Sequence, residues 1–344
     1  MSLILVTGGL GYIGSHTTLK LLENGFDVLV IDSLINTSKK VIENIEKILD
    51  NSTLVKKGKI IFRQGDIRDY ELLNSIFKEF NKSKNSIESV IHFAGLKSIS
   101  NSILNPIEYW DVNVKGTISL LSAMNNNSCF SFIFSSSATI YNSNSLELIK
   151  ENRDLKPINP YGNTKLTTEK ILNDLFVSNR KKWKIVSLRY FNPAGAHFSG
   201  LLGENSKLRS SNLFPKVIDV IEKRINYLPI YGQDWPTHDG TCVRDFIHIT
   251  DLAEAHLLSL KFLMRNEPQN ISLNIGTGKG ASILDVLNTF KSCTNYDLKY
   301  KFVKRREGDY PYVVADNSLA KNILKWAPNK KLIDMCKDAL NFNT

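Results

Sequence analysis

A tyrosine and a lysine four residues apart are the side chains in this sequence best suited to moving a proton. Tyr161 and Lys165 stand in the run Tyr-Gly-Asn-Thr-Lys, and residues at i and i+4 share one face of a helix. A free tyrosine has a pKa near ~10, so a phenolate base near neutral pH needs about 4 kcal/mol of stabilisation. A neighbouring cation such as Lys165 favours the phenolate. The same spacing also arises by chance as a surface pair, so this pair needs support from other motifs.

Three consecutive serines, residues 135–137, follow the apolar run of residues 131–134. That run predicts a buried strand, and ligands bind outside the carboxyl ends of strands in open parallel sheets. The serine hydroxyls are therefore placed to bond both a sugar hydroxyl and the phenol. An ordinary serine-rich turn at the end of a strand is the alternative.

Glycines at positions 8, 9, 11 and 14 follow the first predicted strand and open a helix. Such a loop lets a pyrophosphate approach the backbone at the positive end of the helix. Asp32 ends the second predicted strand, where its carboxylate can bond the adenosine ribose and repel a 2′-phosphate. The motif therefore predicts NAD rather than NADP. The alternative is an ordinary glycine turn followed by an aspartate that caps a helix.

The spacing of apolar residues predicts the elements that position these side chains. In the first half, short apolar runs alternate with amphipathic stretches, which is typical of βαβ units with a parallel sheet. We expect a Rossmann-like, doubly wound α/β fold with an NAD-binding domain at 1–190. A smaller, mixed α/β part that mainly covers the substrate is expected at 191–344, with 273–275 as a candidate return to the main sheet. The predicted strands are residues 3–6, 27–31, 59–62, 89–93, 131–134 and 184–188, and the predicted helices are residues 15–24, 39–49, 69–80, 113–124 and 164–176.

Composition and charge exclude several classes of protein. The 344 residues are 42% hydrophobic, which is enough for a core, and no apolar run approaches the ~20 residues of a membrane-spanning helix. The net charge of +10 comes from lysines spread along the chain, so we predict no nucleic-acid or membrane partner. Four scattered cysteines argue against a disulfide scaffold and a zinc site, and no metal is predicted. The N-terminus lacks the basic and apolar regions of a signal peptide, so we expect the cytoplasm.

Together these motifs resemble those of the extended short-chain dehydrogenase/reductase family, and within it those of the UDP-glucose (UDP-galactose) 4-epimerases. The resemblance runs nearly from end to end of the chain. It rests on the segments at residues 7–16, 65–68, 90–97, 132–139, 188–193, 243–248 and 305–309.

The resemblance implies an NAD-dependent isomerase that interconverts UDP-galactose and UDP-glucose through a 4-keto sugar, which turns before it is reduced again. It implies three catalytic residues: Tyr161 as the base, Ser137 at the 4-hydroxyl and Lys165 at the nicotinamide ribose. It also implies a homodimer joined through two helices per subunit, for which 103–126 and 160–178 are candidates. The expected NAD contacts are Gly8, Gly11, Tyr12, Ile13, Gly14, Asp32, Asn36, Asp66, Ile67, Phe93, Ala94, Gly95, Lys97, Asn113, Ser137, Tyr161, Lys165 and Phe191. The expected UDP-sugar contacts are Ser137, Tyr161, Asn192, Asn212, Arg244, Arg306, Asp309 and Val313.

Three other activities on the same scaffold fit the residues less well. A sugar-nucleotide 4,6-dehydratase adds an Asp-Glu acid/base pair just after the strand-end serine, where this chain has Ala138 and Thr139. Neither side chain can move the required protons. A related decarboxylase would need a carboxylate in the same stretch. A non-catalytic NAD-sensing protein would be expected to have lost Tyr161 or Lys165, and both are present.

The sequence departs from the epimerase pattern at Asn142, Asn163 and Val313. The first two do not carry the chemistry. In the family, the position of Val313 lines the hexose pocket, where tyrosine excludes a 2-acetamido group and a small residue admits it. We therefore expect UDP-N-acetylgalactosamine to be a second, slower substrate. In the alternative, which the sequence leaves open, Val313 packs in a strand and Tyr310 or Tyr312 fills the space.

Overall fold

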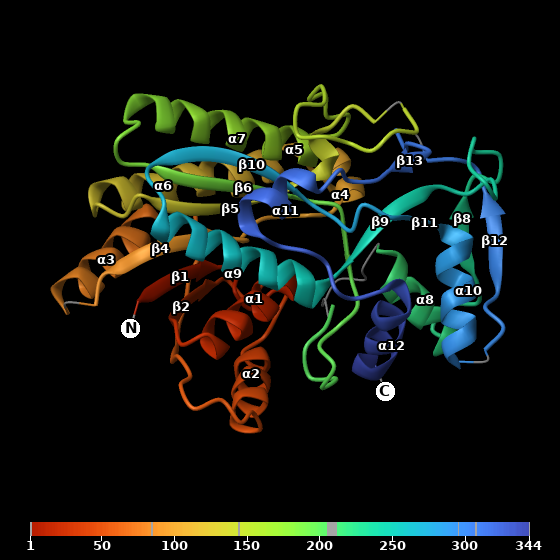
Figure 1. Cartoon of the computed structure of the whole chain (residues 1–344), viewed down its shortest axis with the longest axis horizontal. Helices are drawn as coiled ribbons and strands as arrows, with labels where there is room; N and C mark the ends of the chain where they lie inside the picture. The colour runs from red at the N-terminus through yellow and green to blue at the C-terminus, as the bar shows by residue number, and fades with distance from the viewer. Residues whose placement is uncertain are drawn as a thin grey trace.

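The computed structural model describes residues 2–83, 85–143, 145–204, 212–294, 296–306 and 308–343. Across these ranges seven parallel strands form the main sheet, in the order β10-β6-β5-β4-β1-β2-β3 (Figure 1). The chain runs outward from β1 to β3 and then from β4 to β6 on the other side, so the predicted doubly wound α/β fold is confirmed. The strands are β1 (Leu3–Thr7), β2 (Asp27–Asp32), β3 (Ile60–Gln64), β4 (Ile87–His92), β5 (Ser131–Ser137), β6 (Lys184–Tyr190) and β10 (Gln269–Ile275).

Helices cover both faces of this sheet. Alternate strand residues face opposite layers, so Ile4 and Val6 pack with α1, α2 and α9, whereas Leu3 and Leu5 pack with α3, α6 and α7 (Figure 1). Strands buried on both faces consist of nearly continuous apolar runs, which explains why the sequence marks them so clearly. The helices are α1 (Tyr12–Glu23), α2 (Lys40–Asp50), α3 (Tyr70–Lys82), α4 (Ile99–Leu104), α5 (Pro106–Tyr109), the π-helical η1 (Trp110–Lys115), α6 (Gly116–Asn126), the 3₁₀ turn η2 (Ala138–Ile140), α7 (Pro160–Ser178), α9 (Ile249–Arg265) and α11 (Ser318–Leu324).

The chain after β6 builds smaller sheets with a core of their own. Strand β9 is joined by β7, β11 and β13, while β8 pairs with β12. Helices α8, α10 and α12 pack here around residues such as Phe214, Phe246 and Phe290. Strand β10 pairs with β6, which confirms the expected return of 273–275 to the main sheet; the domain division at residue 190 stays a prediction. The elements are β7 (Asn192–Ala194), α8 (Leu213–Ile221), β8 (Leu228–Tyr231), β9 (Val243–His248), β11 (Gly280–Ser282), α10 (Ile283–Thr294), β12 (Tyr300–Val303), β13 (Tyr312–Val313) and α12 (Leu332–Asn343).

Helix α7 begins four residues earlier than the apolar pattern predicts. The Asn159 side chain accepts a hydrogen bond from the Gly162 backbone N–H at 2.8 Å, and Pro160 occupies the first turn. Both features favour a helix N-terminus. Tyr161 consequently lies in the first turn of α7 rather than in the loop before it.

Across the described ranges, every helix is too short or too polar to span a bilayer.

Candidate active site

The loop between β1 and α1 is shaped by two glycines that no larger residue could replace. Gly8 has φ +66°, and a Cβ there would lie 2.6 Å from the Ala94 backbone nitrogen. A Cβ on Gly14 would lie 2.2 Å from the Gly8 carbonyl oxygen. Gly11, the N-cap of α1, has no side chain with which to cap the first-turn N–H groups, and no acidic residue lies in that turn. Uncapped amides at a helix N-terminus fit a pyrophosphate, so the loop suits the predicted dinucleotide.

Asp32 lies at the carboxyl end of β2 beside this loop. Its carboxylate accepts hydrogen bonds from the backbone N–H groups of Leu10, at 3.1 Å, and Leu34, at 2.9 Å. Burial raises the pKa of Asp32, while the two backbone hydrogen bonds oppose that rise. The side chain is thereby held at the rim of the glycine loop, as a residue that recognises the adenosine ribose requires.

The other residues expected to contact NAD follow successive strands of the main sheet. Since the carboxyl ends of parallel strands meet at one edge, the structure brings these residues to the same side of the sheet. They lie in the loop after β1 or the first turn of α1 (Tyr12, Ile13), in the loop after β2 (Asn36), after β3 (Asp66, Ile67), after β4 (Phe93, Ala94, Gly95, Lys97), on η1 (Asn113), at the end of β5 (Ser137), on α7 (Tyr161, Lys165) and after β6 (Phe191).

Several of these side chains already bind partners within the chain. The Asp66 carboxylate pairs with Arg68 at 2.6 Å, which lowers the pKa of Asp66. Asn113 accepts a hydrogen bond from the Leu96 N–H at 2.7 Å and donates to the Leu96 carbonyl and to Thr164. Asn113 therefore fixes the loop after β4 against α7, a contact that spacing alone does not reveal.

The three predicted catalytic residues come together where β5 meets α7. Lys165 Nζ donates to the Ser135 carbonyl at 2.7 Å and lies 5.8 Å from the centre of the Tyr161 ring. Ser137 Oγ accepts hydrogen bonds from the Thr139 N–H at 3.2 Å and the Thr139 hydroxyl at 3.0 Å. The Ser137 side chain lies close enough to the Tyr161 phenol to lower its pKa, against the larger effect of burial.

The chain by itself keeps the phenol neutral. Burial raises the pKa of Tyr161 to about 12, and the hydrogen bond with Ser137 only partly offsets this. Burial also lowers the pKa of Lys165 to about 8, and its ammonium group is bound to a carbonyl. Lys165 alone therefore does not bring the pKa of the Tyr161 phenol close to neutral pH. Additional positive charge in the cleft is needed to form the phenolate.

The residues expected to bind the UDP-sugar gather around β9. Arg244, on β9, donates to the Asp309 carboxylate at 3.0 Å, and its register partner on β13 is Val313. Asn192 starts β7, which pairs with β9. The Arg306 guanidinium is exposed and lies 3.7 Å from the centre of the Tyr231 ring.

Glu204 links the two groups of expected ligand contacts. Its carboxylate accepts hydrogen bonds from Lys97, on the cofactor side, and from Asn212, on the substrate side, each at 2.7 Å. Spacing along the chain provides no signal for the contact with Lys97, which lies 107 residues before Glu204.

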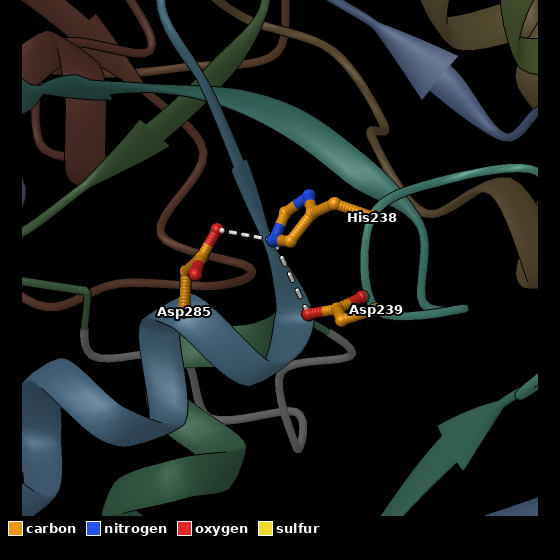
Figure 2. A group of neighbouring side chains, drawn as sticks. All are labelled: His238, Asp239 and Asp285. Carbon is orange, nitrogen blue, oxygen red and sulfur yellow. Dashed lines mark ion pairs between the residues drawn. The ribbon is translucent and has the colours of Figure 1, made fainter.

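A cluster of possible metal ligands lies elsewhere, at the start of α10. Among the described residues, only His238, Asp239 and Asp285 have suitable spacing (Figure 2). His238 Nε2 lies 3.6 Å from Asp239 and 3.4 Å from Asp285. Ser282 donates its hydroxyl to Asp239. The Ser282 N–H also donates to the Asp285 carboxylate, and the Asp285 N–H donates to the Ser282 hydroxyl oxygen. These contacts form a helix-capping box, so we assign the carboxylates a structural role.

Sequence reasoning missed a buried ion pair behind the catalytic helix. Arg189 on β6 and Glu169 on α7 lie 2.6 Å apart. A signal was available, because Glu169 lies four residues after Lys165 and eight after Tyr161, on the same face of a helix.

Comparison with known proteins identifies relatives whose alignments cover nearly the whole chain. The family model described as GDP-mannose 4,6 dehydratase matches residues 5–339. The UDP-glucose 4-epimerase of Bacillus subtilis is 40% identical over 336 residues, which cover 98% of this chain and 95% of that protein. Bifunctional protein GAL10 of Pachysolen tannophilus is 39% identical over 350 residues, and the alignment covers 100% of this chain but 49% of that protein. The crystal structure of the UDP-glucose-4-epimerase from Stenotrophomonas maltophila, with bound NAD and formylated UDP-arabinopyranose, matches with a TM-score of 0.92 and 39% identity over 99% of this chain and 98% of that one.

Proposed function

The chain belongs to the family of the UDP-glucose 4-epimerases, and on that premise we propose that it interconverts UDP-galactose and UDP-glucose with NAD as its cofactor. The family membership confirms the predicted epimerase, which is an isomerase. The observation that carries the proposal is the clustering of Ser137, Tyr161 and Lys165 at the end of β5, on the same edge of the sheet as the glycine loop.

In this reaction Tyr161 accepts the proton of the sugar's 4-hydroxyl and later returns it. Ser137 bonds the same hydroxyl, and the Lys165 ammonium stabilises the phenolate. When bound, NAD supplies the oxidation of C4 and the reduction that reverses it. The 4-keto sugar has to turn over between these steps. Arg244, oriented by Asp309, and Arg306 would hold the diphosphate while the hexose turns.

A dehydratase activity, suggested by the description of the family model, is disfavoured by the residues beside Ser137. Ala138 has no proton to transfer, and the hydroxyl of Thr139 donates to Ser137 at 3.0 Å. Once C4 is oxidised, loss of the C5 proton and the C6 hydroxyl as water needs a separate base and acid at these positions. Epimerisation needs only the tyrosine.

The proposal is tested by incubating the purified protein with UDP-galactose and following UDP-glucose by chromatography. We expect conversion without added NAD and without net accumulation of reduced cofactor, because each oxidation at C4 is reversed within one turnover. A 4-keto-6-deoxy product, or no conversion even with NAD supplied, would contradict the proposal.

The hexose pocket is expected to admit a 2-acetamido group next to Val313. This proposal is supported by the packing of Val313 against a cluster that contains Ala138 and Phe191, two residues next to the ends of β5 and β6. Tyr312 points instead towards Gly280 on β11, and Tyr310 lines an open groove with Asp309. Neither contact involves Val313, which supports the proposal that the space of the missing phenol ring stays open.

We expect slow epimerisation of UDP-N-acetylgalactosamine, and we expect Val313→Tyr to abolish it by filling this space. Turnover of UDP-galactose should change by less than about tenfold in the same variant. Both substrates are assayed on both proteins. The prediction would be refuted if the wild-type enzyme neither converts the acetamido sugar nor is competitively inhibited by it.

We also propose a homodimer formed through the helices of residues 103–126 and 160–178. In the first of these segments large apolar side chains lie on the surface, with Leu104 78% and Ile107 82% exposed, together with Ile103, Trp110 and Ile118. Val177 on α7 is also exposed, and α7 packs against α4 and α5. An exposed apolar patch of this kind marks a protein interface. Sedimentation equilibrium is expected to give twice the 38.9 kDa of one chain, and a concentration-independent monomer would contradict this.

The predicted cytoplasmic location remains part of the proposal. It is supported by the cysteines, since Cys129, Cys242, Cys293 and Cys336 are all free thiols, as proteins of reducing compartments commonly have.

A further inference from the structure

The buried pair of Glu169 and Arg189 lies directly against the catalytic helix. Arg189 Nη2 and Nε donate to the two carboxylate oxygens of Glu169 at 2.6 and 3.0 Å, in a bidentate geometry. The two side chains are only 8% and 6% exposed. Bidentate pairing fixes relative orientation as well as distance. The pair therefore sets the position of α7 against β6.

The same carboxylate also reaches the strand that carries Ser137. Ser136 donates its hydroxyl to Glu169, while the Ser135 carbonyl accepts from Lys165 at 2.7 Å. Two residues of α7, spaced four apart, thus hydrogen-bond to consecutive serines of β5. Tyr161, four residues before Lys165, lies beside the third serine, Ser137.

The remaining donor of Arg189 extends the network to a third strand. Its Nη1 donates to the Tyr141 hydroxyl at 2.7 Å and to the Glu151 carbonyl at 2.9 Å. The Tyr141 hydroxyl donates in turn to Asn274 of β10 at 2.6 Å. Desolvation makes a buried ion pair a poor source of stability compared with apolar packing. A role in orienting the site explains the network better than a role in stability.

Glu169 also faces the charge of Lys165. Burial lowers the pKa of Lys165 to about 8, and the Glu169 carboxylate opposes that shift. The other ionisable groups around the ammonium are Tyr161 on α7 and His92 on β4. The pKa of His92 is lowered to about 3, mainly by burial and to a smaller extent by the charge of Lys165. Arg189, the partner of Glu169, carries the other nearby positive charge.

We propose that Glu169 and Arg189 are positioning residues of the epimerase, holding Tyr161 and Lys165 in register with residues 135–137 of β5. This inference rests on the proposed function, so wild-type epimerisation is measured first. Absence of activity in the wild-type protein refutes the proposed function, whereas normal activity in the variants below refutes only the positioning role.

The first test is Glu169→Gln, measured as kcat and KM for UDP-galactose between pH 6 and 10. We expect kcat to fall roughly 10- to 100-fold with KM changed less than about threefold, because misplaced groups lose rate rather than binding. Removing the carboxylate lowers the pKa of Lys165, so the alkaline limb of kcat moves to lower pH by about one unit. The matched control is Glu79→Gln, which breaks an exposed pair with Arg63 and is expected to leave both quantities unchanged.

The second test replaces both partners, because a single change leaves a buried arginine unpaired and risks misfolding. The double variant Glu169→Leu with Arg189→Met keeps the volume and removes both charges, an exchange that cores tolerate. We expect it to fold, as judged by circular dichroism, and to show the same loss of kcat with little change in KM. A folded variant with wild-type kcat overturns the proposal. The proposal is also overturned if kcat falls only in proportion to the fraction of protein that is folded, while KM and the pH profile stay unchanged.

Discussion

The Tyr161→Phe variant is expected to lose ~10²–10⁴-fold in kcat for epimerisation while it retains NAD. The change removes the oxygen that exchanges a proton with the 4-hydroxyl, and that is the usual effect of deleting a positioned acid/base group. The ring is preserved, and Lys165, which binds the Ser135 carbonyl, keeps its place. Steady-state kinetics and the NAD released on denaturation give the two readouts.

A Tyr161→Phe enzyme with near-wild-type turnover would show that another group is the base. Ser137→Ala serves as a comparison, since it removes a hydrogen bond to the same hydroxyl but no proton acceptor. We expect it to cost less, about 10- to 100-fold.

The Lys165→Met variant is expected to lose about 10²-fold or more in kcat and to change the pH profile. Methionine keeps most of the length of the side chain but removes the charge, so the phenolate loses a cationic neighbour. The acidic limb of kcat, which reports formation of the phenolate, should therefore move to higher pH. Deprotonation of Lys165, whose pKa burial lowers to about 8, should no longer contribute to the alkaline limb. A reduced rate with an unchanged profile would argue against the electrostatic role.

The central part of the fold was predictable because of where its strands lie. Strands such as β1 and β2 are buried on both faces, so they appear as uninterrupted apolar runs that flank the glycine loop. The carboxyl-end rule then placed Asp32 and Ser137 on one edge of the sheet without any knowledge of side-chain contacts.

The parts that escaped prediction depend on contacts between distant residues. The helix expected at 113–124 starts as the π-helix η1, where Asn113 turns towards Leu96 and Thr164. The short helices α4 and α5 have no clear apolar period, since their large aliphatic side chains lie on the surface. Helix spacing could have placed Glu169 on the face of Tyr161 and Lys165, but its pairing with Arg189 required knowing that β6 lies beside α7.

The fate of the hydrogen on C4 tests the central claim most directly. UDP-galactose with deuterium at C4 of the hexose is converted in ordinary water, and the UDP-glucose product is analysed by mass spectrometry and NMR. If C4 is oxidised and reduced again within one closed site, the deuterium stays on C4 of the product. Loss of the deuterium to solvent would contradict the account, because it would require a proton transfer at carbon that the group of Ser137, Tyr161 and Lys165 does not explain.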